Sequence, residues 1–106
     1  MTGDKSFQVL ISDSAEADLK SIVAYLATEQ PTKLLPFSDD IRKARAFLTD
    51  NPFLYQDYFA FVKRAPLRRS GYNLYYAVDE VNNEVEIIAI FHQKESPQRL
   101  RERINL

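Results

Sequence analysis

The first half of the chain combines one strand-like pattern with two stretches of helical spacing. Residues 7–11 are mostly β-branched, aromatic or aliphatic, which is typical of a strand. Residues 13–16 have the spacing of a capping box, and apolar side chains then recur three or four positions apart over residues 15–26. A second helical stripe covers residues 34–48, and we expect its regular part to begin at Pro36 because proline favours the first turn. The pattern therefore predicts a helical hairpin after the first strand.

The second half of the chain has the shorter periods of β structure. Residues 59–64 form one candidate strand, which Pro66 interrupts. Residues 72–78 and 85–92 form two more candidate strands. Between these two, residues 79–84 are rich in Asp, Glu and Asn, which favour turns, so an antiparallel hairpin is predicted.

The order of these elements predicts an α+β fold. Residues 98–104 follow Pro97 and place Leu100 and Ile104 four positions apart, which predicts a short C-terminal helix that touches the body of the protein. Helices and strands are segregated along the chain, so we expect a three-stranded antiparallel meander with the helical hairpin packed on one face of the sheet. Residues 1–106 are expected to form a single domain.

Composition restricts the chemistry that this chain can use. It has no cysteine and one histidine, so disulfides and thiolate catalysis are excluded, and we expect neither a metal nor a cofactor. The formal charge of −1 and the pI near 5.8 give the whole molecule no attraction for phosphate backbones. No apolar run reaches the length of about 20 residues that a membrane helix needs, so we expect a soluble, cytoplasmic protein without a membrane partner.

The lone histidine, His92, ends the most apolar run of the chain and permits two interpretations. In the structural interpretation, which we favour, it closes a strand that is buried on both sides and anchors the following turn through a backbone hydrogen bond. In the catalytic interpretation it acts as a general acid or base.

Strand alternation places Tyr76 toward the core with its apolar neighbours and Tyr75 on the opposite, open face.

Four cations lie close together before the second strand of the meander: Lys63, Arg64, Arg68 and Arg69. Adjacent basic residues in a strand or turn are most often solvated and protect a sheet edge. A phosphate-binding or protein-binding patch is the competing interpretation. If the chain were a metal-independent nuclease, these four cations with Tyr75 and His92 would be its candidate catalytic residues, although we favour no catalytic set.

The order of elements and several motifs resemble the RelE/ParE superfamily of toxins from bacterial type II toxin–antitoxin systems. The similarity is carried by residues 14–22, by a helix that ends at residues 50–52, and most specifically by residues 72–79 and 87–97. Members of this superfamily often end the last strand with histidine, a few partly basic residues, and then an acidic residue and proline. This chain has Glu95 where many relatives have arginine, and Ser70-Gly71 where many have Phe-Pro.

The resemblance implies one of two activities. RelE-like members cleave messenger RNA on the ribosome, whereas ParE-like members inhibit DNA gyrase. The acidic balance and Glu95 disfavour an RNA-directed toxin, because approach to ribosomal phosphates favours a strongly basic surface. We therefore favour a ParE-like toxin that acts by protein contact; a ribosome-dependent mRNA endonuclease and a catalytically silent antitoxin-binding module remain alternatives.

The resemblance also implies the partners. A cognate antitoxin is expected to wrap the apolar groove between the helical hairpin and the sheet, to form a hetero-oligomer with the toxin, and to provide any contact with operator DNA. The expected partner-binding residues are Leu26, Phe37, Phe59, Phe61, Leu100, Ile104, Arg99 and Arg103.

Overall fold

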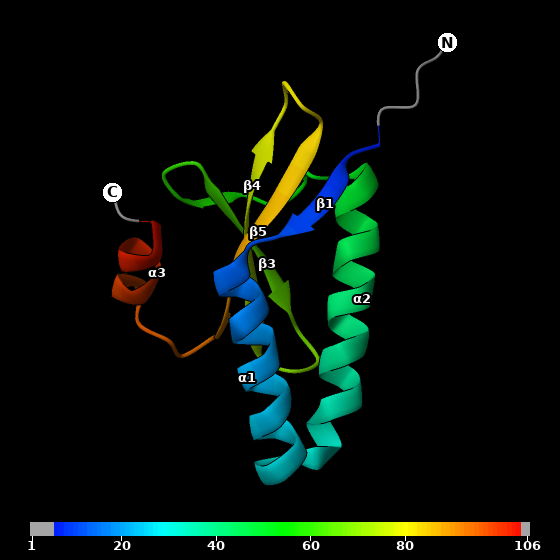
Figure 1. Cartoon of the computed structure of the whole chain (residues 1–106), viewed down its shortest axis with the longest axis vertical. Helices are drawn as coiled ribbons and strands as arrows, with labels where there is room; N and C mark the ends of the chain where they lie inside the picture. The colour runs from blue at the N-terminus through cyan, green and yellow to red at the C-terminus, as the bar shows by residue number, and fades with distance from the viewer. Residues whose placement is uncertain (1–5, 105–106) are drawn as a thin grey trace.

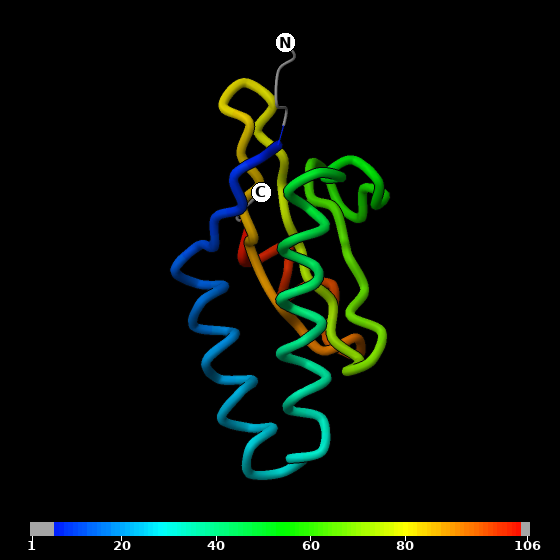
Figure 2. The backbone as a smooth tube through the Cα atoms, turned by 90° about the vertical axis from the view of Figure 1, so that its right-hand side faces the viewer, coloured from blue at the N-terminus to red at the C-terminus, as the bar shows by residue number. Residues whose placement is uncertain are grey.

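The computed structural model describes residues 6–104, which form one mixed sheet covered by helices on both faces. The elements in chain order are β1 (Gln8–Ile11), α1 (Asp13–Glu29), the 3-10 turn η1 (Pro31–Lys33), α2 (Leu34–Asp50), β2 (Asp57–Phe59), β3 (Val62–Leu67), β4 (Tyr72–Asp79), β5 (Glu84–His92) and α3 (Pro97–Ile104). The sheet order is β1-β5-β4-β3-β2, with β1 parallel to β5 and all other pairs antiparallel. Helices α1 and α2 lie side by side on one face, as Figures 1 and 2 show. The predicted α+β fold is confirmed.

The starts of both long helices differ from the prediction. Ser12, not Asp13, caps α1: its backbone is extended, and its Oγ accepts a hydrogen bond from the backbone N–H of Ala15 at 3.1 Å. Helix α2 begins at Leu34 rather than at Pro36. Proline is tolerated inside this first turn because the N–H groups there have no partner within the helix.

The predicted strand over residues 59–64 is wrong, because a tight turn divides it. Ala60 has a φ of 53° and connects β2 to β3 as a hairpin. Strand β3 then continues through Pro66, which sequence reasoning treated as a break. The N–H of Arg64 points away from β4 and donates to Gln56 O at 3.4 Å, so Pro66, two residues on, also faces outward, beyond the end of β2. Its missing N–H therefore removes no bond of the ladder.

A β-bulge in β5 sets which side chains face which helices. Tyr75 pairs with Ala89 and Tyr76 pairs with Ile87, so Ile88 is an extra residue in the ladder. Consequently Ile87 and Ile90 both pack under α1 and α2, whereas Ile88 and Ala89 both pack on the other face. Strict alternation of side chains along β5 therefore fails at this position.

The sheet separates two hydrophobic cores. The larger one lies under α1 and α2, and there the Tyr76 hydroxyl donates to Pro52 O at 2.7 Å, which confirms the inward orientation predicted for Tyr76. The smaller core lies between the sheet and α3 and contains Tyr75 and Leu100. We predicted that Tyr75 would lie on an open face, and this was wrong, because α3 covers it.

Within residues 6–104, no helix is long and apolar enough to cross a membrane.

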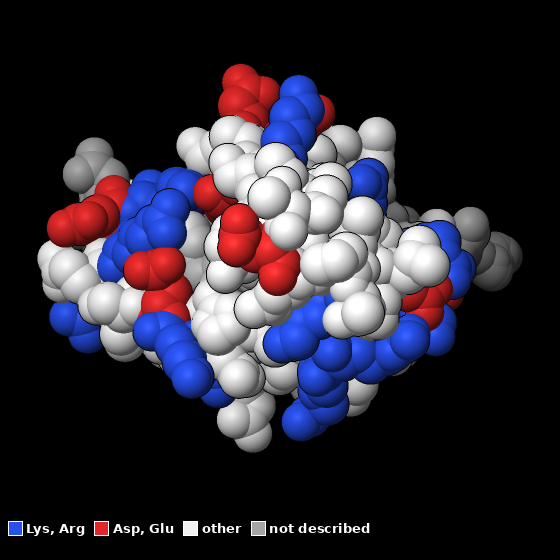
Figure 3. Space-filling model, turned by 90° about the horizontal axis from the view of Figure 1, so that it is seen from below, with Lys and Arg blue, Asp and Glu red and all other residues white. Residues whose placement is uncertain are grey.

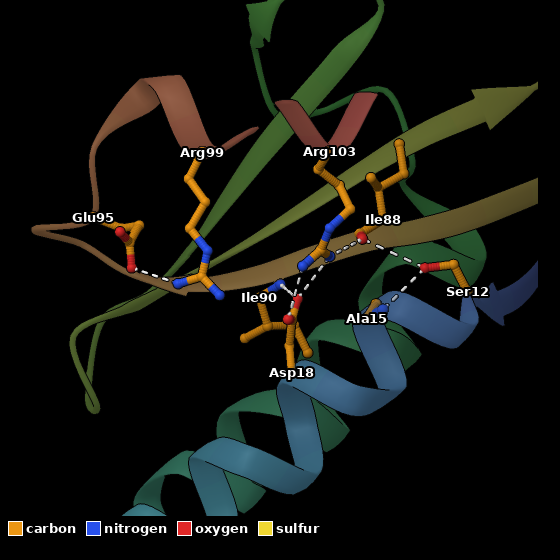
Figure 4. A network of polar contacts seen from close by, with 8 residues as sticks. All are labelled: Ser12, Ala15, Asp18, Ile88, Ile90, Glu95, Arg99 and Arg103. Atoms are coloured by element: carbon orange, nitrogen blue, oxygen red, sulfur yellow. Dashed lines mark hydrogen bonds and ion pairs between the residues drawn. The ribbon is translucent and has the colours of Figure 1, made fainter. Parts of the chain in front are cut away.

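One polar network joins α1, β5 and α3, and Figure 4 shows its members. Strand β1 leaves β5 at Ser12, whose N–H donates to Ile87 O at 3.0 Å, so the backbone of β5 beyond that point loses its neighbour. The Asp18 carboxylate accepts the N–H of Ile90 at 3.0 Å and a bidentate pair of bonds from Arg103, both 3.0 Å long. The Arg103 guanidinium also donates to the carbonyl of the bulge residue Ile88 at 3.0 Å. Side chains thus replace the missing strand.

The network predicts that Arg103 stabilises the fold much more than its neighbours on α3. The side chain of Asp18 is 8% exposed, so removing its partner would leave a nearly buried charge. We expect Arg103→Met to lower the free energy of unfolding by about 3 kcal/mol. Arg101→Met, at an exposed position of the same helix where the guanidinium lies 5.0 Å from the Phe59 ring, is the matched control and should cost under about 1 kcal/mol. Urea unfolding followed by circular dichroism measures both, and equal losses would contradict the role given to this pair.

Candidate functional site

The last residues of β5 border a cleft between α1 and the start of α3. The cleft has a volume of about 450 Å³, and Tyr25, Tyr72, His92 and Arg99 are among its lining residues. Tyr25 is half exposed, whereas Tyr72 is buried and its pKa is raised by burial and by the nearby Tyr25. The charges in the cleft are matched, because Arg99 pairs with Glu95 at 2.8 Å.

His92 is held at the rim of this cleft by contacts on two sides. Its Nδ1 accepts the backbone N–H of Lys94 at 3.1 Å, which is the turn anchor that the structural interpretation predicted. Its ring meets Tyr72 edge-on at a centroid distance of 5.1 Å. Gly71 has a φ of 82°, and a Cβ built on it would lie 3.9 Å from His92 Nε2, so Nε2 faces the β3–β4 turn. Because Nδ1 is already an acceptor, the neutral ring carries its proton on Nε2.

Tyr75 lies on the opposite face of the sheet from His92, within a stack of aromatic rings and cations. Its ring lies 5.5 Å from Tyr58 and 5.8 Å from Phe91. The Arg64 guanidinium lies 4.5 Å from the Tyr58 ring, and Arg99 lies 4.7 Å from Phe91. Burial raises the pKa of the Tyr75 hydroxyl, which makes it a poorer base near neutral pH. This stack holds α3 on the sheet.

The remaining predicted cations are distributed around β3 and not gathered at one point. Lys63 pairs with Asp57 at 2.9 Å, and Arg69 pairs with Asp39 on α2 at 2.8 Å. Lys43 and Arg42 also contact Asp39, and the hydrogen bonds from these two cations lower its pKa. Among residues 6–104, Arg68 has no carboxylate within ion-pair distance.

The six candidates for nuclease chemistry therefore do not form one constellation. Arg64 and Tyr75 are cross-strand neighbours, with Tyr75 buried under α3 and Arg64 exposed, whereas His92 lies on the side of α1. Cleavage of RNA needs a base, an acid and a cation within reach of one phosphate. No group of three His, Asp or Glu side chains suited to a metal ion occurs in residues 6–104.

The predicted partner-binding residues divide according to their burial. Leu26, Phe37 and Leu100 are fully buried in the two cores, so the expectation that they are exposed to a partner is wrong. The helical spacing that identified them points into the core and not toward solvent. Phe59 and Ile104 are half-buried against the smaller core, and Arg103 is committed to Asp18. Phe61 and Arg99 are exposed and remain candidates. The full set of eight predicted partner-binding residues comprises Leu26, Phe37, Phe59, Phe61, Leu100, Ile104, Arg99 and Arg103.

Sequence reasoning missed several residues that shape the surface. Asp18 was one polar position among many on α1, and only the sheet topology shows why it faces inward. The Asp40 carboxylate accepts the N–H of Arg69 at 3.1 Å and ties the β3–β4 turn to α2. Leu54 is 68% exposed in the loop before β2 and was not singled out. Asp40 and Arg69 lie 29 positions apart, so no local sequence pattern links them.

Residues 9–97 match the sequence profile of a family described as the ParE toxin of the type II toxin–antitoxin system parDE. No match was found among curated protein sequences. Three solved structures have similar folds. The chromosomal ParDE system from P. aeruginosa is 20% identical with a TM-score of 0.66, covering 84% of this chain and 98% of that one.

The other two structures are of a RelE toxin and of a RelBE2 complex. A mutant of the E. coli toxin RelE in the free state is 14% identical with a TM-score of 0.65, covering 94% of this chain and 96% of that one. The toxin–antitoxin complex RelBE2 from Mycobacterium tuberculosis is 22% identical with a TM-score of 0.60, covering 82% and 98%. At these identities the structural similarity establishes the fold alone.

The contacts of His92 predict its tautomer. Because Nδ1 accepts the N–H of Lys94, we expect the neutral imidazole to be protonated predominantly at Nε2. A long-range proton–nitrogen correlation spectrum of nitrogen-labelled protein distinguishes the two tautomers, and this chain has a single histidine to assign. A proton on Nδ1 would show that the ring is not anchored to the turn.

Proposed function

This chain belongs to the ParE toxin family of type II toxin–antitoxin systems, and on that premise we propose that it arrests growth by contacting DNA gyrase until a cognate antitoxin neutralises it. The toxin would act in the cytoplasm, form a hetero-oligomer with its antitoxin, and reach operator DNA only through that partner. The proposal concerns the target and the mode of action, since family membership gives the toxin class.

The dispersal of the candidate catalytic residues is the observation that carries this proposal. Tyr75 is buried under α3, and the His92 ring is held between Tyr72 and the β3–β4 turn. Lys63 and Arg69 are each engaged by a carboxylate. A nuclease would need these groups to converge on one phosphate. Inhibition by protein contact needs only a complementary surface, which the exposed apolar side chains can provide.

The charge of the chain supports the same choice. A toxin that enters the ribosome benefits from a strongly basic surface, because that surface accelerates its encounter with RNA phosphates. Here the formal charge is −1, and two of the four cations near β3, Lys63 and Arg69, are paired with carboxylates. Arg99, on α3, is likewise paired with Glu95. Long-range attraction to RNA is therefore weak in this protein.

We expect toxicity to survive removal of the two side chains best suited to proton transfer. Tyr75→Phe keeps the ring in the smaller core, and His92→Asn keeps an oxygen that can accept the N–H of Lys94. The double variant should arrest growth to within about twofold of the parent when induced without antitoxin. Plasmid supercoiling in the induced cells reports gyrase activity, and protein level and unfolding temperature serve as controls.

Different results would point to different functions. If the double variant restores growth at an unchanged protein level and the parent cuts transcripts in translating extracts, the toxin is a nuclease. If induction of the parent leaves growth unaffected, the chain is a silent antitoxin-binding module. Either result would overturn the proposal of gyrase inhibition by contact.

A further inference from the structure

Two arginine side chains lie on neighbouring aromatic rings at the margin of the smaller core. The Arg64 guanidinium lies 4.5 Å from the centre of the Tyr58 ring, and the Arg101 guanidinium lies 5.0 Å from the centre of the Phe59 ring. Tyr58 and Phe59 are consecutive residues of β2, and both rings pack against the smaller core. Because Arg64 comes from β3 and Arg101 from α3, three elements meet at this place.

Phe61 extends the same surface into solvent. It follows Ala60 in the two-residue turn between β2 and β3, and it is 55% exposed. The pairing of Phe59 with Val62 closes the turn and fixes its geometry. A phenyl ring on such a turn loses little freedom when it enters a pocket of another protein. We call Tyr58, Phe59, Phe61, Arg64 and Arg101 the arginine–aromatic edge.

The other arginines that lie on aromatic rings in residues 6–104 are neutralised within the fold. Arg99 and Arg103 both lie over Phe91, at 4.7 and 5.2 Å. Arg99 pairs with Glu95, and Arg103 pairs with Asp18. These two contacts therefore serve to hold α3 on the sheet.

The two arginines of the arginine–aromatic edge lack such partners. Both are exposed, and among residues 6–104 no carboxylate lies within ion-pair distance of Arg64 or Arg101. The ring beneath each guanidinium restricts its motion, while its planar donors remain suited to a carboxylate from another protein. The edge is therefore complementary to an apolar pocket that carboxylates surround.

From these observations we propose that the arginine–aromatic edge is the surface through which this chain contacts DNA gyrase, with Phe61 in an apolar pocket and Arg64 and Arg101 against carboxylates of the enzyme. This inference rests on the proposed function. Aromatic and arginine side chains are the residue types that most often dominate the binding energy of protein interfaces.

The position of the arginine–aromatic edge distinguishes gyrase from the antitoxin as its partner. The edge borders the smaller core, on the face of the sheet that α3 covers. The antitoxin is expected on the opposite face, in the groove between the helical hairpin and the sheet. Because gyrase is much larger than this chain, an antitoxin bound on the neighbouring surface can still exclude it by overlap.

A nucleic acid fits the arginine–aromatic edge less well than a protein does. Bases that stack on a protein need free aromatic faces. Here the guanidinium groups of Arg64 and Arg101 already cover the Tyr58 and Phe59 rings. The formal charge of −1 adds no long-range attraction for phosphates.

The basic surface beside α2 is a weaker candidate for the contact with gyrase. Figure 3 shows Lys and Arg gathered at its lower right, on the side where α2 lies. On α2 and the β3–β4 turn, however, Arg42, Lys43 and Arg69 all contact Asp39. Lys43 and Arg69 also line the hollow between α2 and β3, where the resemblance already implies the antitoxin.

The double variant Phe61→Ser/Arg101→Met tests the inference, with Leu35→Ser/Arg45→Met as the matched control. The control makes the same kinds of replacement at two exposed positions of α2 that lie outside the edge. Sedimentation with purified gyrase measures the affinity of each protein. We expect the edge variant to bind gyrase about tenfold or more weakly, and the control to stay within about twofold of the parent.

Arg64→Gln tests the same surface without a change in the turn or in α3. It keeps a polar side chain and removes the charge, so we expect gyrase binding to weaken by about fivefold or more. Thermal unfolding followed by circular dichroism verifies that every variant is folded. Calorimetry with the product of the adjoining reading frame measures antitoxin binding, which should stay within about twofold of the parent in all variants.

The outcomes separate the inference from the proposed function. If the parent chain does not bind gyrase, the proposed function fails and the inference fails with it. If the parent binds and folded edge variants bind equally well, only the assignment of the arginine–aromatic edge is overturned. It is also overturned if the edge variants lose affinity for the antitoxin to the same degree, or if they keep gyrase binding and lose binding of a labelled RNA or DNA oligonucleotide.

Discussion

The ion pair between Asp18 and Arg103 is the contact on which the arrangement of the helices around the sheet depends. It lies where β1 ends and β5 continues without a neighbour, and it satisfies the N–H of Ile90 and the carbonyl of Ile88. A strand in that position would have given the same bonds but would not have tied α3 to α1. By using one carboxylate from α1 and one guanidinium from α3, the fold completes the strand edge and fixes both helices at once.

Fixing α3 on the sheet determines which surfaces remain for function. The face opposite α1 and α2 would otherwise expose Tyr75 and Phe91, where aromatic rings and cations could meet a substrate. With α3 in place those rings are buried, and the hollowed surfaces that stay open include the cleft beside His92 and the two hollows along β3. Both surfaces lie at the edges of the sheet, between a helix and a strand, where contact with another protein is easier to arrange than convergent proton transfer.

The sequence predicted the elements and the layers because each depends on local periodicity. The α1–α2 hairpin, the β4–β5 hairpin with Asn83 at a φ of 52°, and the short C-terminal helix all follow from spacing and turn residues. What failed depends on single residues that break a period. The bulge at Ile88 reverses the alternation of β5, and the turn at Ala60 divides a strand that looks continuous. The polar network around Asp18 was still harder to predict from the sequence, because the partners of Asp18 lie more than seventy residues away along the chain.

Direct association between the purified chain and purified gyrase tests the central claim, which is that this toxin acts through its surface without a catalytic set. Sedimentation of the two proteins in the absence of RNA should give a saturable complex that disappears when the antitoxin is added. Failure to form any complex, together with cutting of ribosome-bound transcripts by the same preparation, would contradict the account.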